Sequence, residues 1–506
     1  MSYAKALSVG LTGLTGHLVE VEADVAAGLP LLALSGLPDA ALHEARDRVR
    51  AAVTNSGESW PNRRITVNLL PASLPKRGSV FDVAIAVSIL AGTGVLPLAP
   101  LQGVVLLGEL GLDGTVRPVR GILPSVAAAV RAGVRRVVVP LACAREAALV
   151  PEVTVRATDT LRRLIDFIRG CGPLLDPPAL PEAAPATGPD LADVVGQELG
   201  RRGLELAAAG GHHLSMIGPP GAGKTMLAGR LPSILPPLSD EEALEVTAVH
   251  SLAGVLPSDA RMIRRPPFQA PHHSASVAAL VGGGSGLARP GALSLAHCGV
   301  LFMDEAPEFG SQALEALRQP LEDGVVALSR TGGTIRYPAR IMLVLAANPC
   351  PCAPAAGDAF CECPPPVRRR YLGRLSGPLL DRVDLQVRLL PVTAAQLLRD
   401  GEAPEDSATV ATRVARARAA AAERWAALGC RTNAEVPGRD LAGRQWRLPA
   451  GATRPLEAAL NSGAISARGY HRVLRIAWTI TDLDGRDRPG SDDVSEALAM
   501  RMGRLV

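Results

Sequence analysis

The segment that most constrains the fold of this chain is the run Gly218-Pro-Pro-Gly-Ala-Gly-Lys224-Thr225. It matches the pattern G-x-x-x-x-G-K-S/T, follows the apolar run Leu214–Ile217 and precedes a helical pattern, as a phosphate-binding loop requires. Glycines allow backbone N–H groups to turn toward phosphate oxygens, and the N-terminus of the next helix adds the positive end of its dipole. The sequence therefore predicts an α/β domain with a parallel sheet and a nucleotide site at the end of one strand. The residues expected to hold the nucleotide are Gly218, Pro219, Pro220, Gly221, Ala222, Gly223, Lys224 and Thr225.

Lys224 stands out because lysine is rare in this chain. Among the 53 Lys plus Arg residues, only Lys5, Lys76 and Lys224 are lysines. Where Arg fills nearly every cationic position, a retained Lys is expected at a place that a planar guanidinium cannot occupy. Lys224 is predicted to reach the β- and γ-phosphates as a compact charge, and the Thr225 hydroxyl to ligate Mg²⁺. No such chemistry is predicted for Lys76.

Two further strand ends carry polar residues that suit phosphate chemistry. The apolar run 300–303 ends in Asp304 and Glu305; Asp304 is predicted to hold Mg²⁺ and Glu305 to polarise the attacking water. A later predicted strand, Ile341–Ala346, is followed by Asn348, which is predicted to orient that water; a simple turn residue is the alternative. These residues together predict hydrolysis of ATP.

Length and composition predict a globular chain with about three domains. Its 506 residues are 47% hydrophobic and 20% charged with a net charge of +4, which excludes a strongly basic nucleic-acid-coating protein but not a local basic groove. We expect an α/β domain over 1–171, a Pro- and Ala-rich linker over 172–189, an ATPase core over 190–392 and a mostly helical domain over 393–506.

The sequence favours a cytoplasmic protein without a membrane partner. Its first residues lack the pattern of a signal peptide. The stretch 83–108 carries no charge, but Gly and Pro residues interrupt it, so a buried helix, a turn and a buried strand are predicted rather than a membrane span.

Four of the eight cysteines lie close together. Cys350, Cys352, Cys361 and Cys363 offer enough thiolates for one tetrahedral Zn²⁺, and reduced structural thiols are the alternative. The pair His272-His273 has no acidic or Cys neighbour within a turn, so capping or pore-facing hydrogen bonding is expected there rather than metal ligation.

Taken in order, these motifs resemble AAA+ ATPases, and within them the magnesium-chelatase-like ComM/YifB family. The resemblance covers nearly the whole chain and rests on the segments Phe268–Ser274, Arg289–His297, Asp304–Phe309, Asn348–Cys352, Leu375–Asp384 and Ser466–Arg472. It implies a multidomain α/β fold with a Lon-protease-like N-terminal domain, an AAA+ core and a C-terminal helical lid.

The resemblance also implies roles that spacing alone does not give. Asn348 is expected to be the first sensor, Arg382 the arginine finger offered to a neighbouring subunit's nucleotide, and Arg468 the second sensor on the lid. A finger supplied by a neighbour implies a ring, expected to be a homo-hexamer. A guanidinium at the γ-phosphate stabilises the spreading negative charge. Because the chain is rich in Arg, an exposed surface charge is the alternative for each.

Between the Asp304-Glu305 and Asn348 strand ends, residues 325–336 read as a β-hairpin around a Gly-Gly turn. In related ring ATPases such a hairpin points into the pore, so Arg330 and Arg336 are expected to contact DNA phosphates. A solvated hairpin is the alternative.

Residues 1–170 resemble the Lon-protease-type domain in the segments Leu74–Ala86 and Gly108–Gly121. The nucleophilic Ser position of that family aligns with Val80, and its Lys position with Leu123. Ser79 is next to it, but a Ser hydroxyl without a Lys or His to accept its proton is a poor nucleophile. The domain is therefore expected to lack protease chemistry and to bind nucleic acid or organise the ring.

The resemblance implies an ATP-driven ring motor on DNA, a branch-migration helicase in recombination and natural transformation with branched or single-stranded DNA as partner. The alternative is a magnesium-chelatase-type ATPase subunit that drives metal insertion into a tetrapyrrole. The substitutions at Val80 and Leu123 disfavour an ATP-dependent protease.

Overall fold

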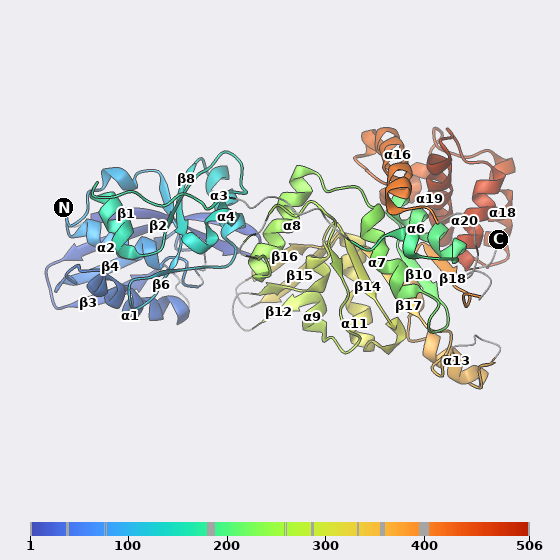
Figure 1. Cartoon of the computed structure of the whole chain (residues 1–506), viewed down its shortest axis with the longest axis horizontal. Coiled ribbons are helices and arrows are strands. Elements are labelled where there is room, and N and C mark those ends of the chain that lie inside the picture. Colours follow the sequence, from blue (N-terminus) through green and yellow to red (C-terminus); the bar gives the residue numbers. More distant parts are fainter. Residues whose placement is uncertain are drawn as a thin grey trace.

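A computed structural model gives the structure of the chain. It describes residues 3–36, 40–74, 76, 78–179, 188–257, 259, 261–284, 288–330, 333–354, 360–393 and 404–503, with side chains throughout except at 40–43 and 330. The molecule is an α/β protein: a sheet-containing N-terminal region is followed by a second sheet with flanking helices, and a helical C-terminal region lies at the far end (Figure 1). This confirms the predicted fold class.

The N-terminal region is built on a seven-stranded sheet of order β3-β4-β2-β1-β5-β8-β9. Its strands are β1 (Tyr3–Thr12), β2 (Thr15–Ala26), β3 (Leu31–Ser35), β4 (Arg64–Leu70), β5 (Val104–Leu106), β8 (Arg136–Pro140) and β9 (Thr154–Thr158), and β6 (Glu109–Leu110) pairs with β7 (Val116–Arg117). Its helices are α1 (Ala40–Asn55), α2 (Asp82–Gly92), α3 (Ile122–Arg131), α4 (Ala144–Ala147) and α5 (Leu161–Ile168).

The uncharged stretch 83–108 forms the helix α2, a turn and the strand β5, as predicted. Every residue of α2 is buried, because the helix is covered on all sides within its own domain. Among the helices that the structure describes, none has both the length and the apolar character to cross a bilayer.

The second sheet positions the nucleotide loop. Its five strands, in the order β11-β14-β17-β10-β18, are all parallel. They are β10 (Leu214–Ile217), β11 (Phe268–Gln269), β14 (Val300–Met303), β17 (Met342–Ala347) and β18 (Leu385–Arg388). Because parallel strands end at the same edge, the residues that follow β10, β14 and β17 meet at the carboxyl edge of this sheet.

Helices cover this sheet and form the C-terminal region. Around the sheet lie α6 (Glu198–Gly210), α7 (Lys224–Ile234), α8 (Asp240–Ala253), α9 (Val277–Val281), α10 (Ala292–Leu295), α11 (Ser311–Ala316), α12 (Arg318–Asp323), α13 (Pro365–Leu372) and α14 (Gly377–Leu380). The C-terminal helices are α16 (Ser407–Trp425), α17 (Gly438–Leu441), α18 (Ala450–Asn461), α19 (Ala467–Asp484) and α20 (Ser491–Met502). Two short pairs complete the core region: β12 (Gly282–Gly283) with β13 (Arg289–Pro290), and β15 (Val325–Arg330) with β16 (Gly333–Pro338).

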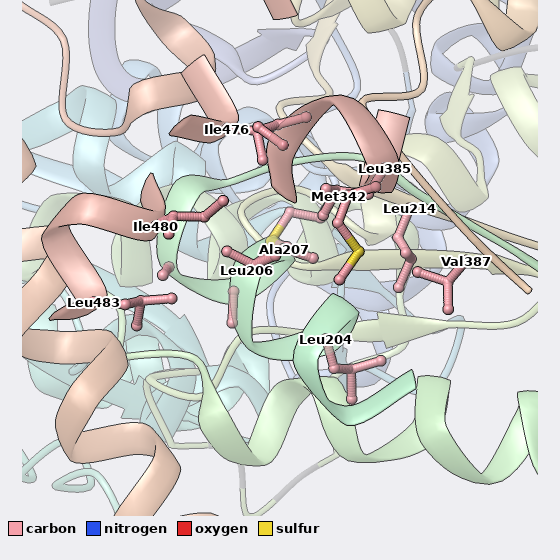
Figure 2. Close-up of a cluster of buried hydrophobic side chains, with 14 of the residues drawn as sticks. Leu204, Leu206, Ala207, Leu214, Met342, Leu385, Val387, Ile476, Ile480 and Leu483 are labelled. Atoms are coloured by element: carbon pink, nitrogen blue, oxygen red, sulfur yellow. The ribbon is translucent and has the colours of Figure 1, made fainter. Parts of the chain in front are cut away.

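One hydrophobic core joins the sheet to the C-terminal helices. Figure 2 shows Leu204 and Leu206 of α6 among side chains of the sheet strands, such as Leu214, and of α19, such as Ile480. Since these side chains are fully buried, each contributes about 1.5–3 kcal/mol through burial, so α6 and α19 are held firmly against the sheet.

The N-terminal region contacts the core region through α3 and α8, which lie side by side at the junction (Figure 1). The Gly121 N–H donates to the Ser251 carbonyl at 3.4 Å, and the Ser251 hydroxyl donates to the Glu146 carboxylate. The linker predicted over 172–189 falls partly on 180–187, which lie outside the described residues.

Candidate active site

The loop between β10 and α7 has the backbone shape of a phosphate site. Gly221 and Gly223 adopt left-handed φ angles of +77° and +83°, and Gly223 caps the N-terminus of α7. A Cβ at Gly218 would lie 2.8 Å from the carbonyl oxygen of Leu389, so only glycine fits there. The loop thus leads from a buried strand directly into the N-terminus of α7, where backbone N–H groups face an incoming anion.

Lys224 is held at the centre of this loop. Its Nζ donates to the carbonyl oxygens of Gly218 and Pro219 at 2.7 and 2.9 Å and to Oδ1 of Asn348 at 3.0 Å. Burial lowers the pKa of Lys224, and the nearby carboxylates of Asp304 and Glu305 oppose that shift. The structure therefore joins Lys224 and Asn348, two of the predicted site residues, by a direct contact between the ends of β10 and β17.

The acidic pair lies beside the loop at the end of β14. The Thr225 hydroxyl donates to Oδ2 of Asp304 at 2.7 Å, and the Glu305 N–H donates to Oδ1 of the same carboxylate at 3.0 Å. Hydroxyl and carboxylate oxygens at this spacing are hard ligands of the kind that Mg²⁺ takes together with nucleotide phosphates. The donor set at this edge fits Mg²⁺ and ATP, with Lys224 for the phosphates and Thr225 and Asp304 for the metal.

His273 is a site residue that sequence reasoning missed. Its Nδ1 lies 3.3 Å from Oε2 of Glu305, whose φ of +51° is left-handed and turns the residue out of the strand direction. At His272, Nδ1 pairs with the Ser274 hydroxyl at 2.8 Å, and the predicted pore-facing role stays a prediction. The acidic partner of His273 comes from a different strand end, so no local spacing could have indicated it.

Arg382 and Arg468 are not brought to this edge of the sheet. Arg382 lies just before β18, at the amino edge, whereas the loop follows β10 at the carboxyl edge of the same parallel pair. Arg382 Nη2 contacts Oε1 of Glu322 at 2.6 Å, and Arg468 Nη2 lies 3.8 Å from the same oxygen. The structure thus groups the predicted finger and the predicted second sensor together, apart from the phosphate loop of their own chain.

A buried network fixes the segment that carries Arg382. Arg472 donates to the carboxylate of Asp384, which also accepts the N–H of His213 at 2.9 Å. Burial raises the pKa of Asp384, but Arg472 and the two neighbouring histidines outweigh it and hold the pKa below its usual range. Because Arg472 lies on α19, one turn beyond Arg468, the ion pair ties the segment that carries Arg382 to the C-terminal helices.

The four predicted cysteine ligands come together. The Sγ atoms of Cys350, Cys352, Cys361 and Cys363 all lie within 4.8 Å of one another. Those of Cys350 and Cys352 are 3.3 Å apart, and those of Cys352 and Cys361 are 3.6 Å apart. Hydrogen bonding from Cys350 lowers the pKa of Cys352 to about 7. Zn–S bonds of about 2.3 Å in a tetrahedron separate sulfurs by a little under 4 Å, so this group fits Zn²⁺.

The predicted hairpin forms as β15 and β16, next to the N-terminal region (Figure 1). Ile335 and Tyr337 are buried at its base, whereas Arg336 is exposed. A Cβ at Gly13, in the turn between β1 and β2, would lie 2.9 Å from Cγ2 of Ile335, so the N-terminal region packs closely on this hairpin. The side chain of Arg330 and residues 331–332 lie outside what the structure describes.

The Lon-type segments line a cavity of about 610 Å³ between the N-terminal region and the core. Ser79 and Val80 lie on its wall, and the Ser79 hydroxyl donates to the Glu109 carboxylate. Leu123 is fully buried. Among the described residues that line this cavity there is neither a Lys nor a His.

Three family models match the chain. "Magnesium chelatase, subunit ChlI" matches residues 190–397, "Subunit ChlI of Mg-chelatase" matches 21–142, and "Magnesium chelatase, subunit ChlI C-terminal" matches 404–501. Over a smaller part, 26% of this chain and 16% of the relative, the chain is 28% identical to a Lon protease of Trichlorobacter lovleyi.

Relatives match over the full length. The chain is 55% identical to an uncharacterized protein of Mycobacterium tuberculosis, with 99% of both chains covered. It is 43% identical to the uncharacterized protein YifB of Salmonella typhimurium, covering 99% of this chain and 97% of that one, and 40% identical to the competence protein ComM of Haemophilus influenzae, covering 100% and 99%. With the nucleotide loop, the acidic strand end and the parallel sheet in place, the chain belongs to the ComM/YifB family of magnesium-chelatase-like AAA+ ATPases.

Proposed function

We propose that this protein is an ATP-hydrolysing ring motor that acts on DNA, as a branch-migration helicase in recombination and natural transformation. The observation that carries the proposal is the separation of the phosphate loop and Arg382 onto opposite edges of one parallel sheet. An arginine at the amino edge cannot serve a nucleotide at the carboxyl edge of the same subunit. In a ring, which we propose to be a homo-hexamer, Arg382 of one subunit serves the nucleotide of the next subunit.

The residues at the carboxyl edge support ATP hydrolysis with defined roles. Lys224 exchanges its carbonyl partners for phosphate oxygens, and Asn348, released from Lys224, orients the attacking water. Glu305 accepts the proton of that water, and His273 holds the carboxylate in position. Mg²⁺, when bound by Thr225 and Asp304, neutralises the phosphate charge.

Two observations support DNA as the substrate. Arg336 is exposed on a hairpin whose base is fixed by buried residues, which suits contact with a phosphate backbone. The relative ComM is named a competence protein and is alike over its full length. We propose Arg330 as the second contact on the same hairpin.

The decisive measurement is the ATPase rate with and without four-way-junction and single-stranded DNA. We expect DNA to stimulate hydrolysis and the wild-type protein to displace strands, while Lys224→Ala does neither. The helicase proposal fails if DNA neither stimulates hydrolysis nor is displaced. An ATPase rate that is instead stimulated by a tetrapyrrole together with Mg²⁺ supports the chelatase alternative. The names of the matched family models favour that alternative.

We also propose that Cys350, Cys352, Cys361 and Cys363 bind one Zn²⁺, since their sulfur atoms already lie at the spacing of a tetrahedral site. Cys350 follows Asn348 by two residues, so the metal braces the strand end that carries the sensor. Protein purified without chelators is expected to contain one zinc per chain, and Cys361→Ser to lose it, while Cys171→Ser, at an exposed cysteine far along the chain, keeps it. A metal-free wild-type protein with four titratable thiols in the cluster contradicts the proposal.

A further inference from the structure

Two guanidinium groups and one carboxylate meet on the surface formed by α12, the end of α14 and the start of α19. Glu322 lies near the end of α12, Arg382 in the turn after α14 and Arg468 in the first turn of α19. Oε1 of Glu322 is 2.6 Å from Arg382 and 3.8 Å from Arg468. One carboxylate oxygen is therefore shared between both arginines that the family resemblance places at a nucleotide.

The arginine at the centre of this group is buried and incompletely paired. The side chain of Arg382 is only 9% exposed; its Nη1 donates to the Pro378 carbonyl at 2.7 Å, and its Nε is buried without a hydrogen-bond partner. A buried cation depends on its anionic partner, and the donor that meets the carboxylate is Nη2. Glu322, in contrast, is half exposed at 49% and free to turn away into water.

The segment that carries Arg382 is anchored directly after that residue by contacts to two helices. Arg472 of α19 pairs with Asp384, and Arg501 of α20 donates to the Val383 carbonyl, so both C-terminal helices fix the chain directly after Arg382. Arg472 follows Arg468 by one helical turn, so the same helix that anchors the finger also carries its neighbour. The guanidinium of Arg382 is thus held by buried contacts, while Arg468, at 55% exposed, and Glu322 both remain half exposed beside it.

The charges of this group indicate which kind of anion Arg382 and Arg468 can bind. Two cations and one carboxylate leave the group with an excess positive charge, and a carboxylate presents only two oxygens. A terminal phosphate carries more charge and three oxygens, which match the forked donors of two arginines. We propose that the Glu322 carboxylate is an internal competitor that occupies the place of the terminal phosphate of a neighbouring subunit's nucleotide. This inference rests on the proposed function.

The consequence is that Glu322 raises the protein concentration at which subunits assemble into an active ring. Before the next subunit docks with its nucleotide, Glu322 keeps Arg382 and Arg468 paired; the phosphate then displaces the carboxylate, which turns toward solvent. The formation of each ring interface therefore costs the free energy of one partly exposed ion pair, that of Glu322 with Arg382. Because such pairs are weak, we expect removal of the carboxylate to shift assembly by about 2- to 10-fold rather than by orders of magnitude.

The experiment is ATPase activity as a function of protein concentration for Glu322→Gln, which keeps the shape and removes the charge. We expect its half-saturating protein concentration to fall by about 2- to 10-fold, with its rate at saturation close to wild type. Asp323→Asn is the matched control, because Asp323 is the neighbouring exposed carboxylate on α12 and accepts a hydrogen bond from the Gln319 amide instead. The double variant Glu322→Gln/Arg382→Ala is compared with Arg382→Ala alone by sedimentation with ATP, because Arg382 itself is needed for hydrolysis, and is expected to show no gain in assembly.

Four results overturn the inference: an unchanged or higher half-saturating concentration for Glu322→Gln, an equal shift for Asp323→Asn, a gain in assembly that survives Arg382→Ala, or a wild-type rate per subunit that does not depend on concentration. Binding of a fluorescent ATP analogue to dilute protein is measured in parallel and is expected to be the same in all variants, which excludes a folding defect. Failure of the proposed function looks different: wild-type protein then hydrolyses ATP no faster than Lys224→Ala at any concentration.

Discussion

Lys224→Arg is the sharpest test of how the nucleotide loop works. The Nζ atom of Lys224 makes three contacts of 2.7–3.0 Å around a single nitrogen, and its side chain is almost fully buried. A guanidinium spreads its donors over three nitrogens in a plane, so it cannot reproduce that arrangement or fit the same space. We therefore expect Lys224→Arg to keep the charge and lose the function.

The size of the loss follows from the contacts that are exchanged. If two of the three ammonium donors pass to phosphate oxygens, and each charge-assisted hydrogen bond contributes about 1.5–3 kcal/mol, about 3–6 kcal/mol is lost. At about 1.4 kcal/mol for each factor of ten, kcat/KM for ATP falls by about 10²- to 10⁴-fold. Lys224→Ala is expected to fall by a similar factor.

Steady-state ATPase assays over a range of ATP concentrations measure this loss, with melting temperatures to verify folding. Lys5→Arg is the matched control: Lys5 is exposed and pairs with Glu20 at 3.4 Å on β1 and β2, so either cation serves there. We expect its activity to equal that of wild type. Retention by Lys224→Arg of more than about a tenth of wild-type kcat/KM would refute the reasoning that the loop needs a compact charge.

Three further predictions follow from single contacts. His273→Ala removes the group 3.3 Å from the Glu305 carboxylate, and steady-state kinetics should show kcat lowered by about 10-fold with KM for ATP little changed; an unchanged kcat contradicts the positioning role. Gly13→Ala adds a Cβ at a φ of +63° and 2.9 Å from Ile335, so urea unfolding should show a loss of about 1–2 kcal/mol, and DNA stimulation should fall more than basal ATPase. Burial lowers the pKa of His213 to about 4, below its unfolded value of about 6.5, so the folded state favours the neutral ring. Stability is then fully present above about pH 6.5 and decreases as pH falls toward 4; equal urea midpoints at pH 7.5 and 5 would contradict this.

The strands that carry the site were predictable almost to the residue. Buried apolar runs with sharp ends identify β10 and β14, which have the predicted bounds, and β17 is displaced by one residue. Each run is bounded by a residue that cannot continue a buried strand: Gly218 at the tight loop and Asp304 at the acidic end. The cysteine cluster was predictable for a similar reason, since its four ligands lie within a short stretch of chain.

Contacts between distant elements were not predictable from local patterns. Glu322 has no sequence signal at all, because its two partners come from α14 and α19, and a lone acid at the end of a short helix is common. Sequence likeness assigned roles to Arg382 and Arg468 separately, but only the folded chain shows that they share one carboxylate. The pairing of His273 with Glu305 depends in the same way on β11 lying next to β14.

A parallel sheet has two edges with different chemistry, and this protein uses both. The carboxyl edge collects the ends of β10, β14 and β17 and so gathers Lys224, Asp304 and Asn348. The amino edge holds Arg382, anchored through Asp384 to α19, whose apolar side chains pack against α6 and the same sheet (Figure 2). Any movement of α19 relative to the sheet would therefore move the segment that carries Arg382, because Arg472 cannot separate from Asp384 without leaving two buried charges unpaired. The sheet and α19 thus join the carboxyl-edge site to Arg382 within one subunit.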